Sequence, residues 1–285
     1  MASLVFCSAL AACGGGGESG GIEALPTFYD DAGAAIAVWV PETRTQNANG
    51  EQVQLYLFPF SLHQRTILSS YVSRVGTSTT RNYSIAGRMT TPTVSSGSYS
   101  AKSTTTTTYL GATLFEGVSV IPADNQTRRF EITLAGTSLA DEASTHTSYF
   151  DTRFGLRIGS KSSSTYKVLD PAASREYPEF VTAGEEGDVF TYKVFSNASK
   201  STLLGTEVMS YKVLSVSAAT PYSYAARVEF TIRSYSSTGL LLALQTSVDD
   251  LVYDSTSGAK SSNVSVIVDD IVGSTTSRLS FTRIK

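Results

Sequence analysis

Strict alternation of apolar and polar residues is the clearest pattern in the chain after residue 80. Two runs, 227–233 and 130–134, place an apolar side chain at every second position and a charged or hydroxylated one between. The apolar positions are Val228, Phe230, Ile232, Phe130, Ile132 and Leu134. Because successive side chains of a strand point to opposite faces, both runs predict half-buried strands.

Short segments rich in Ser, Asn and Gly separate such runs. Residues 196–200 follow an apolar run at 190–195, and residues 236–239 stand between runs at 226–235 and 240–253. These segments predict hairpin turns. Residues 240–253 also place Leu240, Leu244 and Val248 at helical spacing, but their position after a turn favours a strand. No other well-capped helix longer than ten residues is predicted.

The predicted fold class is therefore all-β: an antiparallel meander with little helix. Such a meander can close into a barrel, curl into a half-barrel or stack as a sandwich, and the pattern leaves these three open. Residues 22–80 fit less well, with two strands expected at Ala34–Val40 and Val53–Phe60. Pro59 demotes the second to an edge strand or a short run.

An internal repeat divides the predicted body into two similar β-units. Residues 108–112 resemble 202–206, and residues 130–134 resemble 228–232. We therefore expect β-unit 1 over 82–170 and β-unit 2 over 177–285. The stretch between them contains Pro171 and Pro178, which disfavour strand pairing, so it is predicted to be a linker.

The N-terminus has the pattern of a secretion signal. Residues 2–12 form a short apolar segment that ends in small residues, and Cys13 follows. The quartet Leu10-Ala11-Ala12-Cys13 resembles the lipobox of bacterial lipoproteins. This resemblance implies a signal peptide over 1–12, cleavage before Cys13, and lipidation of Cys13. No Lys or Arg precedes Cys13, whereas a signal peptide normally opens with a positive segment, and the sequence leaves open whether the true start lies upstream of Met1.

Residues 13–21 would then be the lipidated cysteine and a flexible tether, because six of the eight residues from Gly14 to Gly21 are glycine. Two or more acyl chains anchor a protein firmly to a membrane. The resemblance also implies a location, since Gly14 is not the Asp that commonly retains lipoproteins at the inner membrane. We expect the outer membrane of a Gram-negative cell, facing the periplasm or the surface.

Composition narrows the function classes. The 285 residues include 42 Ser and 35 Thr, carry a net charge of −3, and are 41% hydrophobic, which suffices for a core and excludes global disorder. The weak negative charge offers no footprint for nucleic acid. No apolar run reaches the roughly 20 residues of a membrane-spanning helix. Cys7 would leave with the signal peptide, so no disulfide within the mature chain is expected.

Residues for catalysis or metal binding are scarce. The only histidines, His63 and His146, belong to no metal-binding pattern, and no G-x-S-x-G motif accompanies them. Both are interpreted as structural rather than catalytic, and His146, in a polar strand-like run, is expected to be a surface or hairpin histidine. Adjacent carboxylates occur at 30–31, 141–142, 185–186, 249–250 and 269–270. In a strand the two members of such a pair face opposite sides, so they are expected to be exposed acids rather than Ca²⁺ ligands.

These observations favour a membrane-anchored envelope lipoprotein that acts as a non-enzymatic structural or interaction module. No cofactor is predicted, and the expected partners are the membrane, through the lipid, and an envelope protein. The alternative is a periplasmic carrier of a hydrophobic ligand held in a curled sheet. The two hypotheses differ in whether inward residues such as Phe230 meet other protein or line a void.

Overall fold

The fold is almost entirely β-structure, which confirms the predicted class. The computed structural model describes residues 43–46, 52–72, 74–90, 96–152, 156–175, 177–220, 223–254, 258–272 and 275–284. The predicted strand at Ala34–Val40 lies outside these residues. The described elements are β1 (Thr43–Gln46), β2 (Gln52–Leu55), α1 (Phe60–Val72), β3 (Ser78–Thr90), β4 (Gly97–Tyr109), β5 (Thr113–Phe115), β6 (Val118–Leu134), β7 (Thr137–Ser138), β8 (Glu142–Asp151), β9 (Arg157–Ser162), β10 (Tyr166–Leu169), β11 (Glu186–Phe195), β12 (Leu203–Thr220), β13 (Ser223–Ser236), β14 (Leu241–Asp254), β15 (Gly258–Val272) and β16 (Thr275–Ile284).

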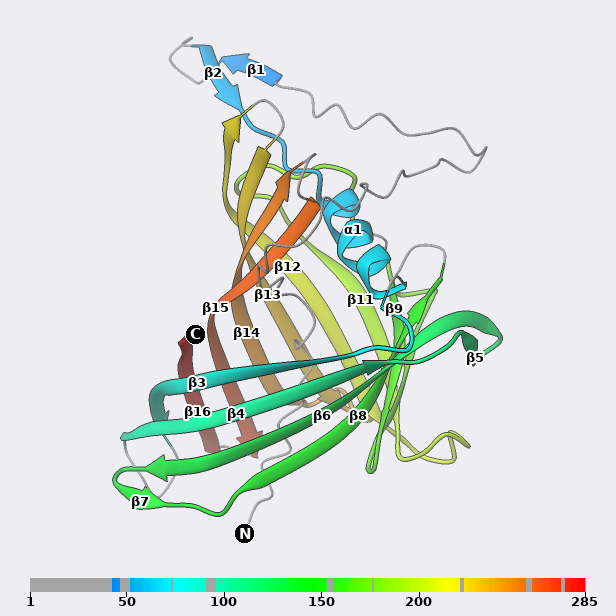
Figure 1. The fold of residues 1–285 in the computed structure, drawn as a ribbon, viewed down its shortest axis with the longest axis vertical. Coiled ribbons are helices and arrows are strands. Elements are labelled where there is room, and N and C mark those ends of the chain that lie inside the picture. The colour runs from blue at the N-terminus through cyan, green and yellow to red at the C-terminus, as the bar shows by residue number, and fades with distance from the viewer. Residues whose placement is uncertain are drawn as a thin grey trace.

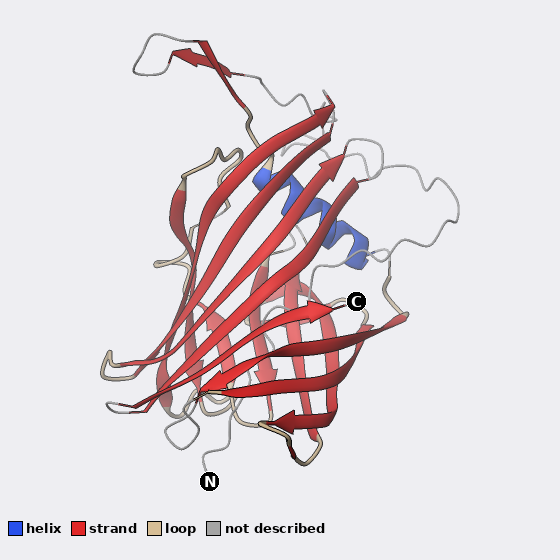
Figure 2. Cartoon of the chain, turned by 90° about the vertical axis from the view of Figure 1, so that its left-hand side faces the viewer, coloured by secondary structure: helices blue, strands red, loops and turns tan. Residues whose placement is uncertain are grey.

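The strands from β3 to β16 form one antiparallel sheet, and β1 and β2 form a separate pair. The order β4-β3-β16-β15-β14-β13-β12-β11-β10-β9-β8-β6 is a meander in which most neighbours are consecutive in the chain. In addition, β6 pairs with β4 as well as with β8, so the series of pairings returns to its first strand. Figures 1 and 2 show the long strands running side by side and curving around an interior.

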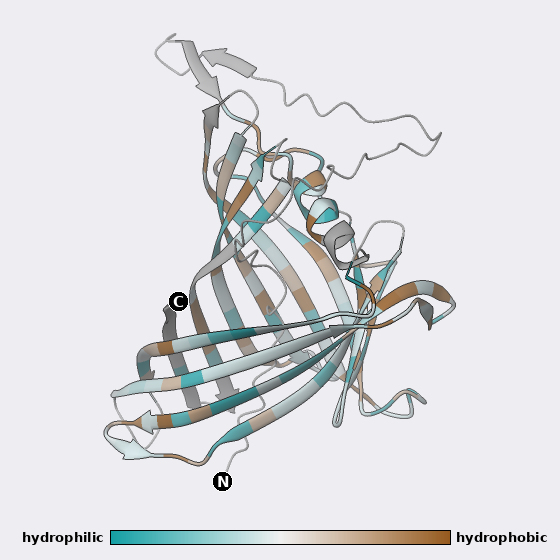
Figure 3. Ribbon diagram, viewed as in Figure 1, coloured by the Kyte–Doolittle hydropathy of each residue, from teal (hydrophilic) through white to brown (hydrophobic). Residues whose placement is uncertain are grey.

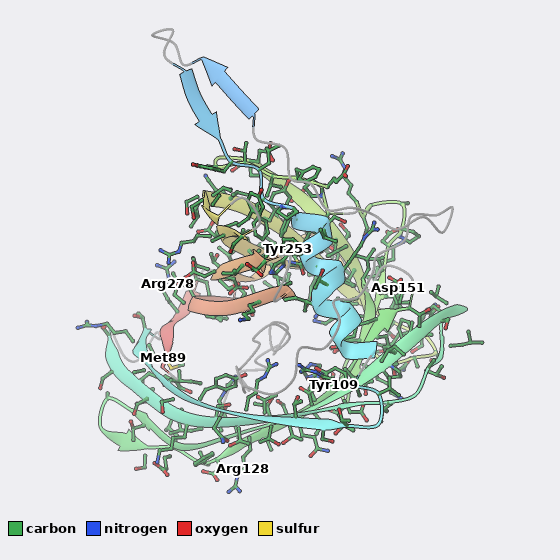
Figure 4. All side chains as sticks on the ribbon, turned by 45° about the horizontal axis from the view of Figure 1, so that its top comes forward. Met89, Tyr109, Arg128, Asp151, Tyr253 and Arg278 are labelled. Carbon is green, nitrogen blue, oxygen red and sulfur yellow. The ribbon has the colours of Figure 1, made fainter. Side chains whose placement is uncertain are left out.

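This circuit of pairings is complete over only part of the strand length. β16 pairs with β3 through Ser84–Thr90 alone, and with β15 through Ser265–Val272 alone. Among the described strands, none pairs with residues 258–264 of β15 on the side away from β14. The helix α1 packs against β15 and β14 at this point. Figure 4 looks towards this end and shows α1 inside the curve of the sheet.

The helix α1 corrects the prediction for this part of the chain. Residues 53–60 were expected to form a strand, but β2 ends at Leu55 and Phe60 begins a helix of 13 residues. The buried side chains Phe60, His63, Thr66 and Ile67 recur at helical spacing. The amide of Ser61 donates to the carbonyl of Pro178 (3.1 Å), which satisfies one of the N–H groups left free at a helix start.

The strands expected at 226–235 and 240–253 are confirmed as β13 and β14. Val228, Phe230 and Ile232 are all buried on one face, as predicted. Ile132 is buried as well, but Phe130 is not on the inner face. A register shift between Ser100 and Lys102 pairs Phe130 with the exposed Lys102, and Glu131 adopts a φ of 50°. This bulge reverses the alternation within the run.

The strands on either side of the predicted linker pair with each other, so the sheet is continuous across it. β10 precedes that stretch and β11 follows it, yet the two strands pair directly, Tyr166 with Phe195 and Leu169 with Tyr192. Of the proposed repeat motifs, residues 108–112 lie at the end of β4, whereas residues 202–206 lie at the start of β12. The division into β-unit 1 (82–170) and β-unit 2 (177–285) stays a prediction.

Candidate functional site

Several residues singled out from the sequence lie outside the described residues. These are Cys13, Cys7 and the pair Asp30–Asp31. Lipidation of Cys13 therefore stays a prediction.

The largest apolar cluster lies where α1 begins. It contains Phe58, Phe60, Tyr211, Val228 and Phe230, among other buried residues of β11 to β14. Phe60 is central, because its ring centroid lies 5.3 Å from that of Tyr211 and 6.2 Å from that of Phe230. The inward residues of β13 therefore meet the chain's own segment at the start of α1 rather than a void.

His63 lies fully buried at this cluster, beside the ring of Phe58. Its Nε2 is 2.9 Å from the carbonyl oxygen of Lys260 on β15, and its Nδ1 is 3.4 Å from the side-chain nitrogen of Gln64. A neutral ring with its proton on Nε2 satisfies both contacts. Burial lowers the pKa of His63 to about 4, against a smaller opposing effect of the Lys260 carbonyl. This histidine attaches α1 to the part of β15 that pairs with β14 but not with β16.

His146 lies on the inner face of β8, where its strand register places it beside Asn125 of β6 and Ser162 of β9. Burial lowers the pKa of His146 to about 4, and the positive charges of Arg157 and Lys167 lower it further. It is therefore neutral at pH 7 and lies close to two cations. The expectation of a surface or hairpin histidine is therefore wrong, because His146 lies within β8 on its inner face and has Arg157 and Lys167 nearby.

Inward polar residues of neighbouring strands form a chain of contacts that we call the inner polar cluster: His146, Arg157, Lys167, Tyr192 and Glu207. Lys167 and Glu207 make a buried ion pair, Nζ to Oε1 at 2.5 Å, with side chains 6% and 8% exposed. The hydroxyl of Tyr192 donates to the carbonyl of Arg157 (2.7 Å), and the Arg157 guanidinium lies 5.0 Å from the centre of the Tyr192 ring. Five adjacent strands, β8 to β12, thus contribute one residue each.

Lys167 points inward because the outer face of its strand is already occupied. Tyr166 and Val168, its neighbours in β10, belong to a cluster with Phe115 of β5. A Cβ on Gly159 would overlap the Phe115 ring, so glycine at 159 leaves room for this ring against the outer face of β9. With Tyr166 and Val168 packed outside, alternation turns Lys167 to the interior. There it is held beside Glu207, 40 residues further along the chain.

Glu207 has one oxygen that no described residue satisfies. Its Oε1 accepts from Lys167, whereas its Oε2 is buried without a hydrogen-bond partner. Native structures leave few buried polar atoms in this state, and each one calls for an explanation. Among the described residues the hydroxyl of Ser247 is in the same state, so the oxygen of Glu207 is distinctive because it belongs to a carboxylate.

Alternation separates the two members of the pair Asp249–Asp250, as a strand requires. Asp250 binds the guanidinium of Arg227 (2.7 Å) on the outer face, whereas Asp249 is buried. The other ion pairs of these acids join Asp141 to Arg128, Glu142 to Arg129, Glu186 to Lys212 and Asp269 to Arg278. The expectation of exposed acids is therefore wrong for Asp249 and Asp269, both of which are 6% exposed. No group of three possible metal ligands occurs among the residues that the structure describes.

The outer face of β3, β4 and β6 carries rows of hydroxyls and ion pairs. Ser78 contacts Thr108 (2.8 Å), Thr80 contacts Thr106 (3.1 Å), and Lys102 binds Glu131 (2.6 Å). Figure 3 shows hydrophilic and hydrophobic segments alternating along these strands, and Figure 4 shows Arg128 pointing away from the interior. The high Ser and Thr content of the sequence is thus used in part for cross-strand hydrogen bonds.

Comparison with known proteins gives no relative for this chain. No family model matches it, and neither a curated protein nor a solved structure shows significant similarity. In the part of the chain that is described, no helix has the length and apolar character needed to cross a membrane.

Proposed function

We propose that this protein is a membrane-anchored envelope lipoprotein and that its β-body is a non-enzymatic structural or interaction module. The quartet Leu10-Ala11-Ala12-Cys13 followed by a glycine-rich stretch supports the anchor. The arrangement of the body supports the module. The apolar part of its inner face, on β11 to β14, is covered by the chain's own Phe58, Phe60 and α1, and the outer face of β3, β4 and β6, rich in hydroxyls and ion pairs, offers a surface for partners.

The contact between Phe60 and Phe230 favours this function over carriage of a hydrophobic ligand. A carrier would need the inward row of β13 to line free space, and that row is packed against aromatic rings instead. Native mass spectrometry of the purified chain tests this point. The module predicts the mass of the bare or acylated chain, whereas a lipid-sized adduct released on denaturation would favour the carrier.

The anchor is tested by producing the full chain in Gram-negative cells that are fed a labelled fatty acid. We expect label on the protein and recovery in the outer-membrane fraction. The variant Cys13→Ala should lose both, and Cys7→Ala serves as the matched control because its cysteine would leave with the signal peptide. An unlabelled, soluble wild-type chain would contradict the proposed anchor.

A further inference from the structure

The most exposed large apolar side chains among the described residues gather on three hairpins. Of the ten such side chains that are 39% or more exposed, six lie at or beside the tips of β5–β6, β11–β12 and β13–β14: Leu114, Val118, Leu203, Leu204, Leu240 and Leu242. Leu114 is the most exposed of them, at 73%. Apolar residues scattered singly over a surface need no explanation, whereas a group of them marks a site of interaction.

Contacts on the outer side of the sheet join these three hairpins. Glu116, in the turn of β5–β6, forms an ion pair with Lys200, in the turn of β11–β12, and accepts a hydrogen bond from the hydroxyl of Tyr166. The start of β12 pairs with the end of β13, which pairs in turn with the start of β14. Tyr235, half-buried on the outer face of β13, stands between the two strands that carry leucines. The six apolar residues are therefore neighbours, and we call them the leucine rim.

The composition of the leucine rim favours a lipid surface over a protein partner. The anchors of protein interfaces are mostly Trp, Tyr and Arg in pockets, and leucine is under-represented among them. Five of the six rim residues are leucines, and they stand at hairpin tips. Leucine is one of the side chains that enter a bilayer most favourably, and tyrosine is enriched at the boundary between lipid and water.

The charge of the rim is compatible with such a surface. The turn 116–117 contributes one acid and the turn 196–202 one lysine, and these two residues are the ion pair of Glu116 with Lys200. The two turns together therefore carry no net charge, so no unbalanced charge has to leave water when the leucines enter lipid.

We propose that the leucine rim docks the β-body on the surface of a phospholipid bilayer, with its leucines at the boundary between headgroups and acyl chains. This docking rests on the proposed anchor only for the nearness of a membrane. Residues 14–42 separate Cys13 from β1, and a chain of that length reaches at most about 100 Å, so an anchored body is free to turn this side towards the bilayer.

The test uses the full chain with Cys7→Ser and Cys13→Ser, so that no acyl chain contributes and one introduced cysteine carries a polarity-sensitive fluorophore. Leu240→Cys places the fluorophore in the rim. Leu214→Cys is the matched control, because Leu214 is 43% exposed and lies about 30 Å along β12 from Leu204. With vesicles of phosphatidylethanolamine and phosphatidylglycerol, emission from position 240 should shift to the blue and be quenched by spin-labelled lipid, whereas emission from position 214 should stay as in water.

This readout is local, so it separates docking from other attachments. Adsorption through the apolar residues 2–12 would leave the fluorophore at 240 in water. Failure of the anchor is seen in the fatty-acid experiment above and has no effect here, because both native cysteines are replaced.

Paired substitutions in the chain labelled at position 240 measure the part played by the other rim leucines. Leu203→Ser with Leu242→Ser removes apolar area that the bilayer would cover, and should reduce the lipid-dependent shift by about half or more. Leu139→Ser with Leu214→Ser changes two leucines of almost the same exposure outside the rim, and should leave the shift unchanged. If circular dichroism shows that a double variant has unfolded, the comparison of positions 240 and 214 decides.

Four results would overturn the proposal. These are no shift at position 240, equal shifts at positions 240 and 214, an undiminished shift in the folded Leu203→Ser and Leu242→Ser variant, or a shift at 240 that needs no vesicles and grows with protein concentration. The last result would assign the rim to a second copy of the chain.

Discussion

Phe230 and Phe130 hold the same place in two similar alternating runs, yet they lie in different surroundings. Phe230 is 4% exposed and packs against the ring of Phe60. Phe130 is only half-buried, and its partners are Lys102 in register and the guanidinium of Arg128 5.8 Å from its ring. Alternation in the sequence predicted both residues as inward because a one-residue bulge leaves no mark in a hydrophobicity pattern.

Truncating these two residues should therefore have unequal effects. Phe230→Ala removes a core aromatic ring and should lower the free energy of unfolding by about 3–5 kcal/mol. Phe130→Ala is the matched control and should cost about 1 kcal/mol, as expected for a half-exposed side chain. Urea denaturation followed by tryptophan fluorescence or circular dichroism measures both. Equal losses would mean that Phe130 is also a core residue.

His63 makes stability depend on pH. Its folded-state pKa of about 4 is below the value of 6.5 for a free histidine, so the unfolded chain binds the proton more tightly. The stabilisation from the neutral ring is complete above pH 6.5 and is lost as the pH falls towards 4, with a total of about 3 kcal/mol.

This predicts a melting temperature that falls between pH 6.5 and pH 4, and a weaker fall in the variant His63→Gln. Glutamine can still donate to the carbonyl of Lys260 but does not titrate. Because the pKa of His146 is lowered in the same direction, His146→Gln should be combined with it to isolate the two effects. A wild-type profile that is flat over this range would contradict a buried neutral His63.

At the scale of elements, the sequence predicted strands well and missed the helix. Hairpin turns at 196–200 and 236–239 have clear chemistry, and the strands beside them follow from period two. The buried face of α1 consists of Phe60, His63 and Ile67. Because the polar His63 occupies one of these positions, the sequence shows no apolar repeat at helical spacing. The helix is held by tertiary contacts with β15 and with Pro178, which no local pattern contains.

The pairing of β12 with β13 depends on glycine at one position. A Cβ at Gly205 would overlap the carbonyl oxygen of Tyr235, whereas nothing lies within 4 Å of the corresponding position at Gly111. Gly205→Ala must push the two strands apart and should cost about 1–3 kcal/mol. Gly111→Ala should change the free energy of unfolding by less than about 0.5 kcal/mol. Chemical denaturation of the two variants gives the comparison, and a neutral Gly205→Ala would show that the strands can separate freely there.

At the scale of the whole molecule, the sheet is joined by pairings between distant parts of the chain. β3 and β16 lie almost 200 residues apart, and β4 pairs with β6 across the β5 hairpin. Neither pairing is encoded in local alternation, which is why the sequence left barrel, half-barrel and sandwich open.

The inner polar cluster was missed for a related reason. Lys167 stands between the apolar residues Tyr166 and Val168, so alternation alone predicts that its side chain points outward. The structure shows the reverse, because Tyr166 and Val168 pack against Phe115 on the outer face.

The uneven length of these pairings predicts where the molecule opens first. β13 is paired over almost its whole length on both sides, with β12 and β14, whereas β16 is joined to β3 only through residues 84–90 and 278–284. Breaking the second junction leaves the largest apolar cluster in place, because that cluster lies at the start of α1 and on β11 to β14. Partial opening requires less free energy than global unfolding wherever few buried contacts are broken.

Hydrogen–deuterium exchange of the native protein should therefore show the amides of β16 and of β3 exchanging well before those of β13. The variant Phe230→Ala should speed exchange of β13 towards that of β16 and leave β16 little changed. Uniform protection across all three strands would mean instead that the sheet opens only as a whole.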